Sequence, residues 1–195
     1  MRRALVQFDG SNFYNKVKTL LPGVHLTHFD YAGLARFLAQ KCTTNVAYYV
    51  GEIKLYPGNK KSQQLYSSQQ SLFSHLRTQK VAIKTGYLLQ SKGVFHEKGV
   101  DVRIAVDMAV GAVRNEYDVC YLISSDTDLI PAIETAQEAG KKVVYVGFKG
   151  AVSQGLKKNC SSYVIVTPKD LKPFFSWELN FTLSHSSRVT LILVQ

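Results

Sequence analysis

The chain has 195 residues, of which 46% are hydrophobic and 19% are charged, and its formal net charge is +10 at pH 7. A chain this apolar is not disordered, and it is long enough to fold as one domain around a continuous core. The positive charge favours a polyanionic partner such as a nucleic acid, but it is equally compatible with a basic protein that binds none.

The sequence also limits the cellular location. No apolar run is long enough to span a bilayer, and Asp9 interrupts the short run that follows the start, so we expect neither a membrane protein nor a secreted one. The three cysteines, Cys42, Cys120 and Cys160, have neither disulfide nor zinc-site spacing, which favours reduced thiols and a cytoplasmic location.

Short β-branched or aromatic runs alternate along the chain with longer segments of helical periodicity. In chain order, these patterns predict a strand at 4–8, helices at 12–21 and 31–41, a strand at 46–51, a helix at 63–79, a strand at 81–87, a helix at 100–117, a strand at 119–124, a helix at 128–139, a strand at 142–147, a helix at 151–158 and a strand at 163–167. Such alternation predicts an α/β fold that is doubly wound, with a mostly parallel sheet, right-handed crossovers and helices on both faces.

The pattern changes after about Pro173, where apolar residues alternate with polar ones in two short runs. We therefore predict one domain over residues 1–172 and a C-terminal extension over 173–195 that forms a β-hairpin. Three roles are open to this extension: it covers a sheet edge, it pairs with a second chain in a homodimer, or it carries no function.

Aspartates follow the predicted strands at the edge of the sheet where ligands bind in such folds. Asp9 follows the first strand, Asp126 and Asp128 follow the strand at 119–124, and Asp101 lies in the first turn of the helix at 100–117. Carboxylates that converge repel one another unless they share a cation, and an oxygen-rich site suits Mg²⁺ or Mn²⁺.

Each aspartate also has a structural interpretation. Asp128 is a suitable helix N-cap, Asp101 would favour a helix dipole, and Asp9 before a glycine is common turn chemistry. Taken singly, each favours structure, whereas the set at two strand ends and one helix start favours a site. Asp107 lies about 240° around the helix from Asp101, so it is either a supporting residue or a solvated acid. Glu97 lies on the loop that we expect before this helix, and we assign it no role.

Small and polar residues accompany these acids. Gly10 would let a backbone approach closely, while Asn12 at a helix start can donate to a phosphate or orient an aspartate. We expect Asn12, Ser124 and Asp107 to give the acids polar support.

Three segments resemble the NYN domain of the PIN-like nuclease superfamily, particularly its LabA-like branch. They are Phe-Asp-Gly-Ser-Asn at 8–12, the stretch from Glu97 to Asp107, and Ile-Ser-Ser-Asp-Thr-Asp-Leu-Ile-Pro at 123–131, followed by matching residues at 139–142 and 146–148. The resemblance covers about residues 3–167. The family pattern after this strand usually reads Ser-Gly-Asp-Ser-Asp-Phe, and this chain departs from it at Ser125, Thr127 and Leu129 while keeping both acids.

The resemblance implies a PIN-like sheet whose acids bind Mg²⁺ or Mn²⁺ for ribonuclease chemistry. Carried over by position, Asp9, Asp101 and Asp126 become metal ligands. Asp128 becomes a further ligand or a residue that orients a water, and Asn12 a polar partner of the site.

Basic residues occur after several predicted strands and would form a rim that holds RNA phosphates. They are Lys54, Lys60 and Lys61 after the second strand, and Lys149, Lys157 and Lys158 after the fifth. We therefore expect a metal-dependent endoribonuclease in which Asp9, Asp101, Asp126 and Asp128 are catalytic and single-stranded RNA is the partner. The alternative is a PIN-like module that binds RNA or a protein and does not cut.

Overall fold

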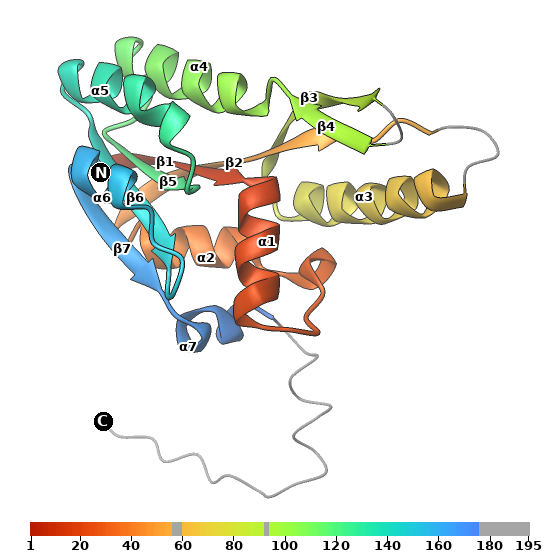
Figure 1. The fold of residues 1–195 in the computed structure, drawn as a ribbon. Coiled ribbons are helices and arrows are strands. Elements are labelled where there is room, and N and C mark those ends of the chain that lie inside the picture. The colour runs from red at the N-terminus through yellow and green to blue at the C-terminus, as the bar shows by residue number, and fades with distance from the viewer. Residues whose placement is uncertain (56–59, 92–93, 176–195) are drawn as a thin grey trace, which may run out of the picture.

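The computed structural model describes residues 1–55, 60–91 and 94–175 (Figure 1). Most of the predicted hairpin at 173–195 lies outside these residues. Within these described ranges, seven strands form a single sheet in the order β4-β3-β2-β1-β5-β6-β7, in which the β3–β4 pair is antiparallel and the other pairs are parallel. The strands are β1 (Arg2–Asp9), β2 (Cys42–Glu52), β3 (Ala82–Ser91), β4 (Val94–Lys98), β5 (Val119–Ile123), β6 (Lys142–Phe148) and β7 (Ser162–Val166).

Helices cover both faces of this sheet, which confirms the predicted doubly wound α/β class. The α-helices are α1 (Gly10–Leu20), α2 (Tyr31–Leu38), α3 (Lys60–Thr78), α4 (Val100–Val113), α5 (Ile130–Glu138), α6 (Gln154–Asn159) and α7 (Pro168–Leu171). Three short 3₁₀ helices are η1 (Leu26–His28), η2 (Thr127–Leu129) and η3 (Lys172–Phe174).

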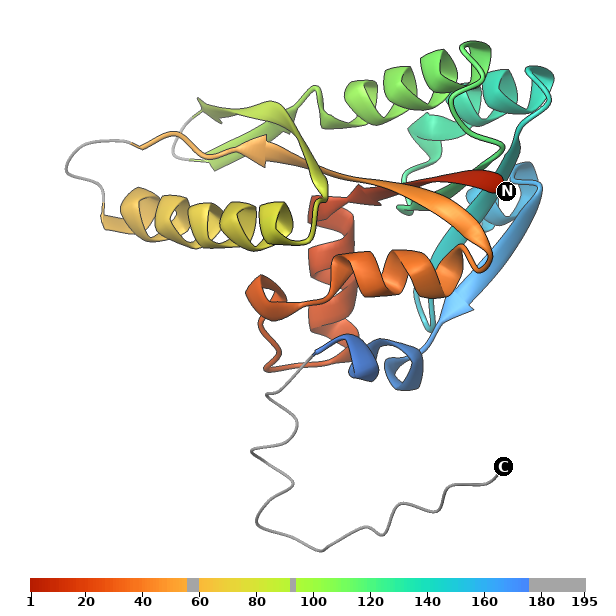
Figure 2. The ribbon, with the colours of Figure 1, turned by 180° about the vertical axis from the view of Figure 1, so that it is seen from behind.

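Each face of the sheet has its own hydrophobic core. Residues of α1, α2, α3 and α7 form one core with alternate residues of β1 and β2, such as Phe8 and Tyr48. Residues of α4, α5 and α6 form the other core with the opposite sides of the same central strands. Figures 1 and 2 show α4 and α5 on one side of the sheet, and α2 and α3 on the other. Alternation along buried strands thus supplies both cores at once.

The chain changes direction at the middle of the sheet. It builds outward from β1 to β2 and β3, and then crosses back to add β5, β6 and β7 on the other side of β1. The carboxyl ends of β1 and β5 border this switch point, where α/β sheets bind their ligands. Asp9 is the last residue of β1, and Ser124 directly follows β5.

The antiparallel strand β4 was not predicted, because its five residues were interpreted as a loop before α4. It pairs with the end of β3 from Tyr87–Lys98 to Ser91–Val94, so only two residues of the chain separate the two strands. A hairpin connection this short is set by pairing between neighbouring strands, which hydrophobic periodicity over five residues does not reveal.

β2, β3, β4 and α3 form an arm that projects past the end of β1 (Figure 2). Asp9 pairs with Tyr49, while β2 continues to Glu52. Gln69 of α3 is only 6% exposed and clamps the end of β2. Its Nε2 donates to the carbonyl of Gly51 at 2.8 Å, and its Oε1 accepts from the N–H of Ile53 at 2.8 Å. One side chain thereby satisfies two backbone groups at the end of β2, past the last residue of β1.

The packed body continues a little beyond the predicted boundary at residue 172. The carbonyl of Phe174 accepts from the N–H of Asp30 at 2.7 Å. Phe175 is buried against Phe29, with ring centroids 4.8 Å apart. Among the described helices, none combines the length and the apolar character needed to cross a membrane.

We expect Gln69→Ala to lower the free energy of unfolding by roughly 1–3 kcal/mol, because it leaves the buried Gly51 carbonyl and Ile53 N–H without partners. Chemical denaturation of the purified variant measures this loss. Gln64→Ala removes an exposed glutamine of the same helix and should change stability by less than about 0.5 kcal/mol. Equal effects of the two substitutions would contradict the clamp.

Candidate functional site

Asp9 ends β1 and caps α1 at the switch point. Its Oδ1 accepts from the N–H of Asn12 at 3.1 Å, and its Oδ2 accepts from the hydroxyl of Ser124 at 2.7 Å. Only 5% of Asp9 is exposed, and this burial raises its pKa to about 6. The two hydrogen bonds oppose the rise in pKa, while the nearby charges of Asp101 and Glu97 add to it. Asp9 therefore has a structural role as the cap of α1, and its role as a metal ligand stays a prediction.

Polar side chains hold the loop after β5 against the start of α1. The Ser124 hydroxyl, which donates to Asp9, accepts from the N–H of Asp126 at 3.1 Å. The side-chain amide of Asn12 contacts the Ser125 hydroxyl through both of its polar atoms. Its Nδ2 donates to that hydroxyl at 2.9 Å, and its Oδ1 lies within accepting distance of the same hydroxyl at 3.0 Å. Asn12 and Ser124 thus occupy the positions that polar support of Asp9 requires.

The loop after β5 gives its two aspartates different environments. Asp126 caps η2, because its Oδ1 accepts from the N–H of Asp128 at 2.9 Å. Asp128 itself is exposed, and α5 begins after Leu129 without a side-chain cap. The interpretation of Asp128 as the N-cap is therefore wrong, and capping belongs to Asp126.

Asp101 couples to the other acids through space. It lies in the first turn of α4, where partial desolvation raises its pKa, and the negative charges of Asp126, Glu97 and Asp128 raise the pKa further. Carboxylates from β1, β4, α4 and the loop after β5 therefore lie close enough to repel one another.

Glu97 lies beside these acids, although its expected position on a loop predicts no role for it. Its Oε2 accepts from the N–H of Gly51 at 2.6 Å and from the hydroxyl of Ser11 at 3.0 Å. β4 carries it there, so the unpredicted hairpin explains the omission. The signal available was its place at the start of the second family-like segment, four residues before Asp101.

Among the described residues, these acids form no ion pair with a lysine or an arginine. In the described ranges, the ion pairs of Lys and Arg involve other acids: Asp118, Asp30 and Asp107. The same ranges contain no three His, Cys, Asp or Glu side chains grouped closely enough to hold a metal ion by themselves. The arrangement is thus an open set of oxygen donors rather than a closed cage.

Asp107 lies apart from this set, contrary to its predicted supporting role. The Tyr49 hydroxyl donates to it at 3.1 Å, and it pairs with Arg103 at 3.1 Å and Lys84 at 3.8 Å. Six residues of helix rotate its side chain away from that of Asp101, toward β2 and β3.

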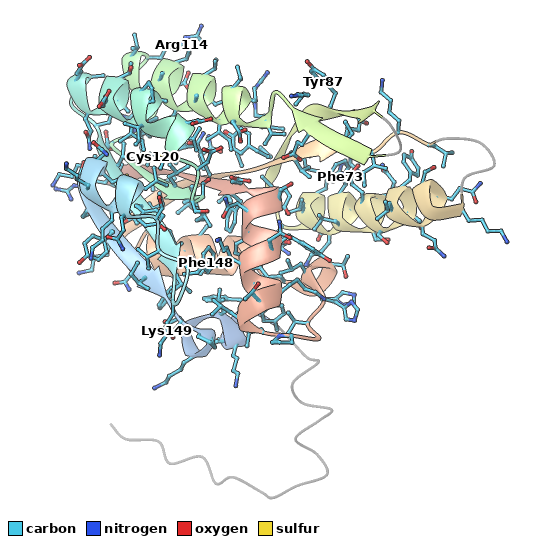
Figure 3. The ribbon with its side chains drawn as sticks, in the orientation of Figure 1. Phe73, Tyr87, Arg114, Cys120, Phe148 and Lys149 are labelled. Carbon is cyan, nitrogen blue, oxygen red and sulfur yellow. The ribbon has the colours of Figure 1, made fainter. Side chains whose placement is uncertain are left out.

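The predicted basic rim does not form as one surface. Lys157 and Lys158 lie in the last turn of α6, which runs back toward the start of β7, and Lys157 stacks over Tyr163 at 4.5 Å. The N–H of Lys149 donates to Val166, so this residue lies at the end of β7 beside α7 (Figure 3). The loop lysines after β6 were expected at the carboxylate edge, but the direction of α6 carries two of them away from it.

The remaining predicted lysines belong to the arm. Lys54 is exposed just past the end of β2, and Lys60 is exposed at the first turn of α3. Lys61 follows in the same turn, and its side chain lies outside the described residues.

Gly10 serves the fold rather than a phosphate. A Cβ at this position would lie 2.5 Å from the Tyr49 carbonyl and 2.6 Å from the Tyr48 ring. The close approach that the glycine permits is therefore that of β2 within the protein.

A family model described as NYN domain matches residues 3–168. The chain therefore belongs to the NYN domain family, as its three motif segments predicted. The match covers nearly all of the packed body, and the placement in the LabA-like branch stays a prediction.

Part of the chain is similar to the uncharacterized protein MJ0482 of Methanocaldococcus jannaschii, with 38% identity over 66 residues. That match covers 34% of this chain and only 27% of the length of the relative. The fold is similar to the crystal structure of VPA0982, a protein of unknown function from Vibrio parahaemolyticus RIMD 2210633. The TM-score is 0.57, with 21% identity over 86% of this chain and 94% of the other.

A structure of T5 5'-exonuclease with bound divalent metal ions (zinc) also matches, with a TM-score of 0.36 and 20% identity. It covers 67% of this chain and 52% of the other. A TM-score this low supports no conclusion about the present site.

The raised pKa of Asp9 predicts a specific pH dependence in the metal-free protein. Its folded-state pKa of about 6 exceeds the ordinary 3.8, so the folded state binds more protons between these values. Stability should therefore fall as pH rises from about 4 to about 7, by roughly 2–3 kcal/mol from this group. Asp9→Asn should lack that loss when both proteins are denatured chemically in chelator across the pH range.

Asp118→Asn provides the control of opposite sign. Hydrogen bonds from Arg3 lower the pKa of Asp118 to about 2, so its contribution is present above the ordinary pKa and is lost as pH falls. A stability difference between wild type and Asp9→Asn that does not change with pH would contradict the raised pKa.

Proposed function

We propose that this NYN-domain protein is a metal-dependent endoribonuclease that cleaves single-stranded RNA at its acidic cluster. The observation that carries the proposal is the cluster itself. Asp9, Asp101, Asp126, Asp128 and Glu97 lie near one another at the switch point of the sheet, and they form no ion pair with the described Lys or Arg residues. Burial, and then repulsion from neighbouring acids, raises the pKa of Asp9 and Asp101. A bound cation would relieve the repulsion between these acids.

The donor chemistry fits Mg²⁺ or Mn²⁺. The donors are carboxylate oxygens, and Asp101 and Asp128 are exposed, which leaves room for water ligands. Mg²⁺ usually keeps several waters and binds through one or two carboxylates plus substrate phosphate, so it needs no closed cage. Asp9, Asp101, Asp126 and Asp128 are the residues that would hold the ion. When bound, the ion activates water and neutralises charge that develops on the phosphodiester.

The protein groups prepare this chemistry before the substrate arrives. Hydrogen bonds from Asn12 and Ser124 fix both oxygens of Asp9, so its remaining lone pairs have a defined direction. Glu97 joins the backbone of β2 to Ser11 of α1 and thereby fixes the arm against the site. Supporting contacts of this kind hold ligands in a productive geometry.

RNA is the proposed substrate for two reasons. The chain carries a net charge of +10, which favours a polyanion, and its resemblance to the NYN family implies ribonuclease chemistry. The lysines of the arm, Lys54 and Lys60, remain candidates for phosphate contacts. We also propose a cytoplasmic location, since the three cysteines are free thiols in the structure.

We expect Asp126→Asn to abolish cleavage of labelled single-stranded RNA and to abolish the rise in melting temperature that added Mn²⁺ gives the wild type. Stability without metal should be unchanged or higher, because asparagine caps η2 as well as aspartate does and the substitution removes a repulsive charge. Cleavage assays and thermal melts, each with and without Mn²⁺, measure both effects.

Glu134→Gln is the matched control, because it neutralises an exposed acid of α5 outside the cluster and should leave cleavage and the Mn²⁺ response intact. Two results would contradict the metal site: a wild-type melting temperature that millimolar Mn²⁺ does not change, or an Asp126→Asn protein that still cleaves RNA. Cleavage that persists in chelator, or none of any RNA, would favour the module that binds without cutting.

A further inference from the structure

A groove of about 480 Å³ lies between α1 and α3. Tyr14 and Lys18 of α1 form one wall, Ser68 and Leu72 of α3 form the other, and Val50 of β2 lies at its base. The arm of the protein therefore encloses a space that neither the sequence motifs nor the acidic cluster explains.

The groove adjoins the acidic cluster across the first turn of α1. Gly10 and Ser11 line it, and they directly follow Asp9 in the chain. The Ser11 hydroxyl donates to Glu97 at 3.0 Å, so one side chain lines the groove and contacts the cluster. A strand whose phosphate lies at the cluster would pass this opening.

The charge of the groove is opposite in sign to that of the cluster. Its lining residues include Lys18 and no aspartate or glutamate. Lys54 is exposed directly after Ile53, which also lines the groove. A polyanion is therefore attracted to the groove, whereas an acidic ligand at the cluster itself would need a bound cation.

The walls combine flat apolar surface with free polar groups. Tyr14 is 50% exposed at the groove, and Leu72 and Val50 are apolar. Within the described chain, the side chains of Thr27 and Ser68 make no hydrogen bond. A nucleobase has the matching chemistry, with an apolar face that stacks on aromatic rings and a polar edge that seeks hydrogen bonds.

We propose that this groove binds one unpaired base of the RNA strand next to the cleaved phosphodiester, and that it thereby selects single-stranded RNA. A base in a duplex is stacked and paired on both its face and its edge, so it cannot enter. This inference rests on the proposed nuclease function in one respect, because that function makes the neighbouring phosphodiester the one that is cleaved. Binding of the base itself does not depend on catalysis.

The test measures the affinity of a short fluorescein-labelled oligouridine by anisotropy in chelator, where metal-dependent cleavage does not occur. Ser68→Trp fills the groove from an exposed position and should weaken binding roughly tenfold, since stacking of one base contributes to binding on this scale. Ser67→Trp places the same ring on the neighbouring exposed residue, outside the groove, and should bind as wild type.

A second pair of variants covers the case in which the tryptophan perturbs the fold. Tyr14→Ala removes the stacking ring and should weaken binding to a similar degree. Tyr163→Ala removes a ring of nearly equal exposure, 48%, on β7 and should not. Circular dichroism and melts confirm that the variants are folded.

The outcomes separate the two proposals. Unchanged oligouridine affinity in both Ser68→Trp and Tyr14→Ala overturns the groove, as does an equal loss of affinity for a duplex of matched length. If these variants lose affinity while wild type cleaves no RNA with Mn²⁺, the groove stands and the nuclease proposal fails. If wild type cleaves and the variants bind and cleave equally well, the nuclease stands and the groove fails.

Discussion

The hydrogen bond from Ser124 to Asp9 joins the two halves of the sheet where the chain changes direction. Burying a carboxylate is costly unless its oxygens have partners, and here the Ser124 hydroxyl and the Asn12 N–H supply them. The same serine holds the N–H of Asp126. One buried acid thus determines how α1 begins, where the loop after β5 lies and which way the cluster opens.

That constraint also explains the electrostatics of the site. Asp9 caps α1 and Asp126 caps η2, so two of the acids are fixed in place by their roles in the fold. Burial raises the pKa values of Asp9 and Asp101, and repulsion from the neighbouring acids raises them further. Functional sites often retain such unfavourable charge because binding of a ligand relieves it. The geometry alone does not name a reaction for this cluster, and membership of the NYN family supports the proposed nuclease chemistry.

The arm gives the cluster a second neighbour of different character. Gln69 of α3 donates to the carbonyl of Gly51 in β2, and Glu97 accepts from the N–H of Gly51 and from the hydroxyl of Ser11 in α1. These hydrogen bonds fix the walls of the groove between α1 and α3. The lysines predicted to form a rim are spread over the arm, the end of β7 and α6 rather than gathered around the acids. Binding of a strand would therefore depend on the shape of the arm as well as on charge.

The sequence by itself determined the doubly wound class, the strand ends that carry Asp9, Asp126 and Asp128, and the helix start that carries Asp101, because hydrophobic period and position after a strand are local properties. Only the tertiary structure decided the roles of Glu97 and Asp107. Glu97 reaches the site through a hairpin that forms by pairing with β3, and Asp107 turns toward Lys84 and Arg103. The direction of α6, the clamp of Gln69 and the groove beside α1 likewise depend on contacts between segments distant in the chain, which no local pattern encodes.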